Sequence, residues 1–247
     1  MKTFIKRLLA NSGYALQRLP PHIPSGHFLE RDIPLVLGRR AGAVCIDAGA
    51  HDGSFIDQLR RCLPTPVIHA FEPAPEPFSR LRSRHATTPG VHLVAAGLSD
   101  QPSILDFHLF DNQTLNSFLP LATDAQSALG GVNQIAEVRV PVVRLDDYAA
   151  EHGLGEIALL KMDTQGFELR ILQGAEHLLA AGRVRAVLVE LNFVSLYAGQ
   201  VWAHEVIAHL HARGLYLVDF YEKCRLPPHL GWCTALFAQR EATPAGP

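Results

Sequence analysis

The chain has 247 residues, of which 48% are hydrophobic, and its 22 basic and 24 acidic side chains give a formal net charge of −2. This size and hydrophobic content suit one large α/β domain with a buried core. The balanced charge does not provide the electropositive surface that binds a phosphate backbone, so we expect no nucleic-acid partner. The four cysteines, Cys45, Cys62, Cys224 and Cys233, form no Cys-x-x-Cys pair. They indicate reduced thiols and a cytoplasmic protein.

The first 20 residues are basic and contain no apolar run long enough for a signal peptide or a membrane span. We expect residues 1–40 to form an N-terminal helical extension whose amphipathic start packs on the domain or on a second copy in a homo-oligomer. A helix lying on a membrane surface is the less favoured alternative. Residues 41–240 are predicted to form the main domain, and residues 241–247 a disordered tail.

Short apolar runs alternate with amphipathic stretches from residue 43 onward, which predicts strands and helices in turn. Pro64 and Pro66 end the first helix, and Pro75 begins the second, where proline is tolerated. The predicted strands are residues 43–46, 67–71 and 91–95, and the predicted helices are residues 55–63 and 75–85.

The middle of the chain has a different pattern. Residues 104–110 and 138–143 have strand character, whereas residues 123–134 are small and polar. We predict an antiparallel β insertion after the third strand, with a mobile connection.

Regular alternation resumes at residue 157. Strands are predicted over residues 157–162 and 184–191, followed by two closing strands over residues 215–220 and 234–238 with a proline-rich link. One helix follows residue 167, with Gly174 as a weak point, and another ends at Gly214. Near-continuous apolar strands indicate a sheet covered on both faces, so we predict a doubly wound, mostly parallel sheet with an antiparallel last strand.

The most informative loop follows the first strand, with the sequence Asp-Ala-Gly-Ala-His-Asp-Gly over residues 47–53. In a doubly wound sheet the ligand crevice lies at the carboxyl ends of the strands, beside the first one. Gly49 and Gly53 allow a sharp turn and a close approach to a ligand. His51 lies in the same loop and is a candidate contact.

Two cofactor classes compete for this loop. A dinucleotide such as NAD calls for Gly-x-Gly-x-x-Gly, but no residue between Gly49 and Gly53 is a glycine. S-adenosylmethionine has no pyrophosphate and carries an ammonium and a sulfonium, which Asp47 suits directly or by fixing the loop amides. The sequence therefore favours S-adenosylmethionine over NAD.

Two further loops are candidate contacts of the adenosine part. Glu72 ends the second strand, where a carboxylate can accept hydrogen bonds from both ribose hydroxyls, and Phe71 and Pro73 can enclose the ring. After the third strand, Ser99 or Asp100 is a candidate acceptor for the adenine amine, although an ordinary polar turn is an equal alternative.

These segments, together with the run Lys-Met-Asp-Thr-Gln-Gly-Phe-Glu from Lys161 to Glu168 and the Gln-Gly-Ala that follows, resemble the FkbM family of methyltransferases. The resemblance spans residues 44–237. It implies a Rossmann-like class I methyltransferase fold and methyl transfer to a hydroxyl of a sugar, glycan or natural product. One departure is Thr234, which stands where the family often carries an acid.

The candidate catalytic residues end the fourth and fifth strands. Asp163 can orient the acceptor, act as a base or hold the cofactor; Lys161 lies on the same face and can pair with it; Glu190 ends the next strand. A Mg²⁺ ion held by Asp163, Glu190 and Asn192 is a less favoured alternative, and no metal is predicted. Glu168 is either functional or a solvated helix carboxylate.

The acceptor itself is not specified by the sequence, because one fold hosts many chemistries. The region expected to select it is residues 110–134. Besides an O-methyltransferase acting on a small molecule or glycan, an NAD-dependent oxidoreductase and an inactive methyltransferase-like binding module stay as alternatives.

Overall fold

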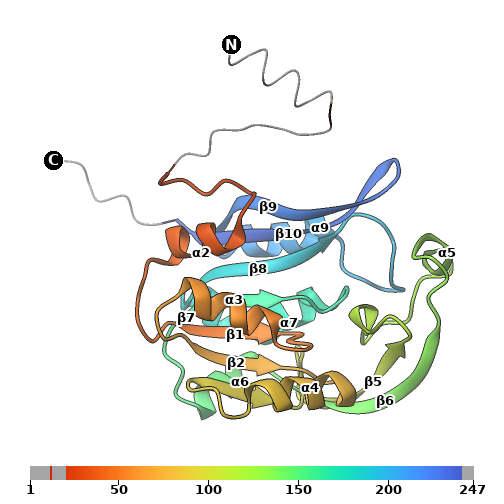
Figure 1. The fold of residues 1–247 in the computed structure, drawn as a ribbon, viewed down its shortest axis with the longest axis horizontal. Coiled ribbons are helices and arrows are strands. Elements are labelled where there is room, and N and C mark those ends of the chain that lie inside the picture. Colours follow the sequence, from red (N-terminus) through yellow and green to blue (C-terminus); the bar gives the residue numbers. More distant parts are fainter. Residues whose placement is uncertain (1–11, 13–20, 241–247) are drawn as a thin grey trace.

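The computed structural model describes residue 12 and residues 21–240. The predicted amphipathic start of the N-terminal extension and the predicted tail therefore lie outside the described residues. The core is a seven-stranded sheet in the order β3-β2-β1-β7-β8-β10-β9 (Figure 1). The strands are β1 (Val44–Ala48), β2 (Val67–Phe71), β3 (Val91–Val94), β7 (Ile157–Met162), β8 (Val184–Asn192), β9 (Leu215–Leu226) and β10 (His229–Gln239).

The pairing confirms the predicted doubly wound sheet. Strand β1 pairs in parallel with both β2 and β7, so the strand order reverses there and the carboxyl ends of these strands meet at one edge. Strand β10 runs antiparallel to β8 and β9, as predicted for the last strand. Ligands bind outside such an edge because the crossovers leave a crevice at the reversal.

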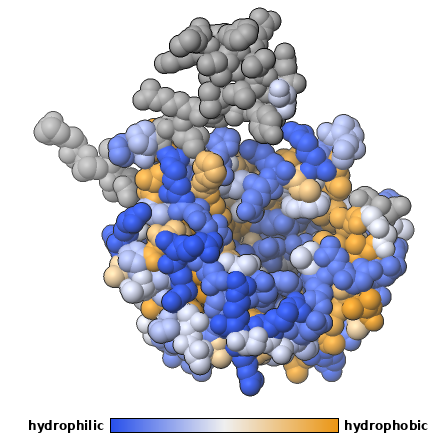
Figure 2. Space-filling view, viewed as in Figure 1, coloured by the Kyte–Doolittle hydropathy of each residue, from blue (hydrophilic) through white to orange (hydrophobic). Residues whose placement is uncertain are grey.

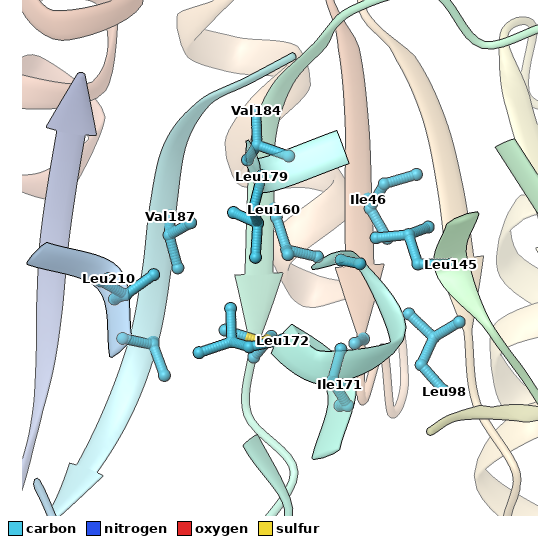
Figure 3. Packing of buried hydrophobic residues seen from close by; sticks show 14 of the residues in the cluster. Ile46, Leu98, Leu145, Leu160, Ile171, Leu172, Leu179, Val184, Val187 and Leu210 are labelled. Atoms are coloured by element: carbon cyan, nitrogen blue, oxygen red, sulfur yellow. The ribbon is translucent and has the colours of Figure 1, made fainter. Parts of the chain in front are cut away.

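Helices cover both faces of the sheet. On one face, Ile33, Ile56 and Leu81 pack into a common core with β1 and β2. They come from α2 (Leu29–Leu37), α3 (Ser54–Cys62) and α4 (Pro75–His85). The other face carries α6 (Leu145–Glu151), α7 (Glu168–Gly174), α8 (Glu176–Ala180) and α9 (Ala203–His211). Figure 3 shows Leu145, Ile171, Leu179 and Leu210 of these helices pointing at the apolar side chains of β1, β7 and β8.

The predicted β insertion is a second, three-stranded sheet in the order β4-β6-β5. Its strands are β4 (Gly97–Leu98), β5 (Ser103–Phe110) and β6 (Gln134–Val143), with β5 and β6 antiparallel. The 3-10 turn η1 (Gln113–Leu115) and the short helix α5 (Ala125–Ala128) lie between β5 and β6.

The structure corrects three details of the sequence prediction. The helix expected after residue 167 is divided at Ala175 into α7 and α8, directly after Gly174, where a Cβ would lie 2.0 Å from the carbonyl oxygen of Ser99. Helix α6 was not predicted, since two turns give little periodicity. The closing strands are longer than predicted, and Pro227 and Pro228 alone separate them. Among the described helices, none is both long and apolar enough to cross a bilayer.

Candidate active site

A cavity of about 560 Å³ opens at the carboxyl edge of the sheet. Its walls come from the loops after β1, β2 and β7, from β8, β9 and β10, and from helices α2 and α3. Gln113, Thr114 and Asn116 close it from the insertion, within the region predicted to select the acceptor. Figure 2 shows hydrophilic residues gathered around a hollow in this face.

The loop after β1 is held close to the loop after β7. Gly49 has φ of 77°, and a Cβ there would lie 2.1 Å from the carbonyl oxygen of Asp163. The backbone N–H groups of Gly49 and Ala50 both donate to the carbonyl of Phe71, 3.0 Å away in each case. Glycine is therefore required at position 49 by backbone conformation and by contact, and it places His51 and Glu72 on the same wall.

Asp47 and Lys161 form a buried ion pair behind this wall. The Nζ atom of Lys161 lies 2.9 Å from Oδ1 of Asp47 and donates to the carbonyl of Gly49 at 2.7 Å. Burial by itself lowers the pKa of Lys161, but the carboxylates of Asp47 and Asp163 outweigh it and raise that pKa. The predicted pairing of Lys161 with Asp163 is thus replaced by a pairing with Asp47, and Asp47 itself does not line the cavity.

Glu72 lines the cavity with an almost fully buried carboxylate. Its Oε2 accepts the backbone N–H of His51 and its Oε1 that of Ala74, both at 2.8 Å. Burial raises the pKa of Glu72 to about 7, although both hydrogen bonds act in the opposite direction. The carboxylate is therefore fixed in orientation and keeps lone pairs that face the cavity.

At the other end of the cavity a glutamine joins two carboxylates. The Nε2 of Gln165 donates to Oδ1 of Asp163 at 2.8 Å and to Oε1 of Glu190 at 3.2 Å. Its Oε1 accepts the hydroxyl of Tyr197 at 2.9 Å, which fixes which end of the amide faces the acids. Burial raises the pKa of Glu190 well above its ordinary value, and repulsion from Asp163 and Glu168 adds to this.

Glu168 belongs to neither predicted alternative, because it is fully buried and does not line the cavity. Its Oε1 accepts the backbone N–H groups of Thr164 and Gly166 and the hydroxyl of Thr164. Burial raises its pKa to about 7. Glu168 therefore shapes the loop that carries Asp163 and Gln165.

Backbone strain is concentrated at this cavity. Four residues other than glycine have positive φ in the described part of the chain: His51 at 50°, Thr65 at 42°, Gln165 at 56° and Glu222 at 46°. All except Thr65 line the cavity. Such conformations cost free energy and persist where the surrounding structure imposes them, often at functional sites.

Seven residues predicted for the site line the cavity: Gly49, His51, Glu72, Pro73, Lys161, Asp163 and Glu190. Thr234, named above as a departure from the family pattern, lines it too. Other predicted residues lie elsewhere. The ring of Phe71 packs against Tyr148 at 4.9 Å between centroids, and Gly53 is the N-cap of α3, beside His85. Ser99 and Asp100 lie against α7, where Arg170 is 3.7 Å from Asp100.

Sequence reasoning missed Gln165, Tyr197 and Glu222. Gln165 stands within the motif that carried the family resemblance, so its position was a usable signal. Glu222 lies in a segment taken for a loop, and nothing in the local pattern marks it. In residues 12 and 21–240 no cluster of three or more His, Cys, Asp or Glu side chains is arranged to hold a metal ion.

Residues 47–216 match the model of the Methyltransferase FkbM domain, which is more than half of the chain. The chain therefore belongs to the FkbM methyltransferase family. This confirms the class predicted from the sequence, a methyltransferase with S-adenosylmethionine as cofactor, and leaves the NAD alternative without support.

Two curated relatives illustrate the similarity. The 31-O-demethyl-FK506 methyltransferase FkbM of Streptomyces tacrolimicus is 33% identical over 202 residues, covering 72% of this chain and 75% of that protein. The 2-O-methyltransferase NoeI of Sinorhizobium fredii is 27% identical over 164 residues, covering 64% and 67%. Among solved structures, a fibrillarin of Aeropyrum pernix with bound S-adenosyl-L-methionine is 13% identical, with a TM-score of 0.43 over 96% of this chain and 74% of that one.

Proposed function

We propose that this chain is an O-methyltransferase that transfers the methyl group of S-adenosylmethionine to a hydroxyl of a sugar, glycan or natural-product acceptor. The observation that carries the proposal is one cavity with the oriented Glu72 carboxylate at one end and the Asp163–Gln165–Glu190 group at the other. The two relatives named above are O-methyltransferases by name, which supports transfer to oxygen.

The residues at the Glu72 end fit the cofactor. A cavity of about 560 Å³ is in the usual range for a ligand of this size. Glu72 offers lone pairs to two adjacent ribose hydroxyls, and Gly49 and His51 bring backbone close to the ligand. The carboxylates that line the walls favour a ligand with net positive charge. We assign Gly49, His51, Glu72 and Pro73 to cofactor binding, with Asp47 and Lys161 supporting the wall.

The residues at the other end fit the transfer step. When bound, S-adenosylmethionine supplies a methyl group on a sulfonium that is already a good leaving group. The protein then has to align the acceptor oxygen, exclude water and accept a proton. Glu190 suits the last task, because its raised pKa makes its carboxylate a stronger base. Asp163 is more exposed and, held by Gln165, suits orientation of the acceptor.

Replacing Glu72 tests the cofactor site. We expect Glu72→Ala to weaken S-adenosylmethionine binding by more than about tenfold, since two hydrogen bonds to a carboxylate are lost. Titration calorimetry gives the dissociation constant. Glu156→Ala, which makes the same change on an exposed side chain outside the cavity, should leave it unaltered. An unchanged dissociation constant in Glu72→Ala would remove the assignment.

The same calorimeter separates the alternatives. Binding of S-adenosylmethionine but not NAD agrees with the proposal, and the reverse contradicts it. A methyltransferase-like module without activity would bind S-adenosylmethionine, yet release no labelled methyl group into any hydroxyl compound. Transfer of a radiolabelled methyl group to an oxygen acceptor is therefore the decisive measurement.

A further inference from the structure

Four polar side chains form a row across the strands at the acceptor end of the cavity. Asp163 follows β7, Glu190 lies on β8, Thr234 on β10 and Glu222 on β9, and all four line the cavity. Thr234 is directly opposite Glu190 in the antiparallel pairing of β10 with β8. Side chains of paired residues lie on the same face of a sheet, so the row is continuous.

Glu222 reaches this row because of a β-bulge. The register between β9 and β10 shifts where Thr234 pairs with Tyr221 and Trp232 with Cys224, which leaves an extra residue on β9. Glu222 takes a φ of 46° in the bulge, and its Oε2 accepts the hydroxyl of Thr234 at 3.1 Å. Bulges redirect side chains next to active sites. A carboxylate from β9 thus lies beside Thr234 at the end of the row.

Asn192 ends the strand that carries Glu190. It is 2% exposed, and neither Oδ1 nor Nδ2 has a hydrogen-bond partner among the described residues. By strand period it shares a face with Leu188 and Glu190, which line the cavity, but Asn192 itself does not line it. A buried amide without partners is unfavourable, so the carboxyl end of β8 contains polar atoms that the described residues leave unsatisfied.

The charges restrict what that ligand can be. The cations of the wall are already paired: Lys161 lies 2.9 Å from Asp47 and Arg61 lies 2.6 Å from Glu30. No Lys, Arg or His side chain of the described residues lies within ion-pair distance of the carboxylates of Asp163 or Glu222, while the raised pKa of Glu190 favours its uncharged form. An acceptor with an acidic group beside its reacting hydroxyl would meet like charge, which costs binding free energy.

We infer that the acceptor is a polyhydroxylated compound without acidic groups and that Glu222, fixed by Thr234, is a specificity-determining residue that rejects anionic acceptors. This inference rests on the proposed function. Hydroxyl or protonated amine groups of the acceptor donate to the row.

The first experiment uses three pools of hydroxyl compounds with radiolabelled S-adenosylmethionine: neutral glycosides and polyols, amino sugars, and uronic acids with hydroxy acids. The wild-type protein should label the first or second pool at least about tenfold more than the third. Glu222→Lys should shift labelling toward the third pool by at least about tenfold, while its dissociation constant for S-adenosylmethionine stays within about twofold.

The outcomes separate the two proposals. Three results overturn this inference if the protein binds S-adenosylmethionine. They are wild-type labelling of the acidic pool as strong as that of the others, labelling of neither of the other two pools, and a wild-type preference that Glu222→Lys keeps. Absence of both S-adenosylmethionine binding and labelling overturns the proposed function. Lys223→Glu, an adjacent exposed position that does not line the cavity, controls for a general effect of charge on this strand.

A second experiment uses the strained backbone. Thr65 has a similar φ but does not line the cavity, so Thr65→Gly is a matched control for Glu222→Gly. Relief of the positive φ should hold or raise the Tm of both variants. Thr65→Gly should transfer methyl groups normally, whereas Glu222→Gly should lose at least about tenfold in kcat/KM for the preferred pool. Full transfer and unchanged preference in Glu222→Gly would contradict the role of its carboxylate.

Discussion

The pairing of Asp47 with Lys161 shows how single residues support the cavity wall. Asp47 is fully buried, and among residues 21–240 only the ammonium of Lys161 lies within ion-pair distance of its Oδ1, at 2.9 Å. Removal of one member of a buried pair leaves an uncompensated charge, which is far more costly than loss of the pair itself.

Lys161→Met is therefore expected to lower the free energy of unfolding by about 3 kcal/mol or more. Adding Asp47→Asn to Lys161→Met removes the stranded charge and should recover most of the loss. Urea unfolding of the single and double variants measures both effects. If the double variant is as unstable as the sum of the two single variants, the carboxylate of Asp47 does not depend on Lys161.

For single residues, the sequence predicted where site side chains lie better than which side chains they pair with. The spacing from Asp47 to Glu72 placed both at neighbouring strand ends, where the structure has them. Strand period correctly put Lys161 on the same face as Asp163, but period says nothing about how far a long side chain bends back toward β1. Glu222 could not be predicted as a site residue, because a bulge is created by the pairing of β9 with β10 and leaves no periodic signal in the sequence.

Gly174, the last residue of α7, shows how a neighbouring loop restricts the residue type at a helix end. A Cβ at this position would lie 2.0 Å from the carbonyl oxygen of Ser99 and 2.9 Å from its carbonyl carbon. These are backbone atoms of the loop after β4, so they cannot move aside as a flexible side chain does.

Gly174→Ala should thus lower the free energy of unfolding by about 2–4 kcal/mol, although alanine is the better helix former. Gly155→Ala is the matched control, because nothing lies within 4 Å of a Cβ there, and it should change stability by less than about 0.5 kcal/mol. Thermal and urea unfolding of both variants decide the matter. Equal stability of the two would mean that the loop after β4 yields freely.

Elements with a long apolar run or a proline boundary were predicted almost to the residue, as for β2 and α4. One helix was predicted after residue 167 because the apolar spacing continues past Gly174, whereas the structure has a break at Ala175 between α7 and α8. Helix α2 lay inside the predicted helical extension, but its packing against α3 depends on contacts that no local pattern encodes. The insertion was predicted as antiparallel, and residues 110–134 were expected at the acceptor site, where Gln113, Thr114 and Asn116 line the cavity.

Two buried groups, His69 and Glu168, make the stability of the whole molecule depend on pH in opposite directions. His69 is 3% exposed, contacts the hydroxyl of Tyr148 at 2.8 Å through Nδ1 and stacks on His92. Burial lowers its pKa to about 4 from 6.5, so the unfolded chain takes up a proton before the folded one does. Stability from this group is present above pH 6.5 and is lost as the pH falls toward 4.

We expect the His69 effect to remove about 1–3 kcal/mol between pH 6.5 and pH 4. His69→Gln, which cannot bind that proton, should show a correspondingly flatter decline in urea unfolding over the same range. An identical decline in wild type and variant would place the acid sensitivity in other groups.

Glu168 acts at the opposite end of the range. Burial raises its pKa from 4.5 to about 7, so the folded chain holds a proton that the unfolded chain has already released. Stability from this group is complete below pH 4.5 and is lost as the pH rises through 7. Glu168→Gln has no such proton, so its stability relative to the wild type should rise by about 1–3 kcal/mol between pH 5 and pH 8.

Urea unfolding at both pH values gives this difference directly, with the exposed Glu156→Gln as control. A difference that stays constant with pH would mean that Glu168 is ionised in the folded protein throughout, and its oxygen without a partner would then carry an unpaired buried charge that the rest of the fold must tolerate.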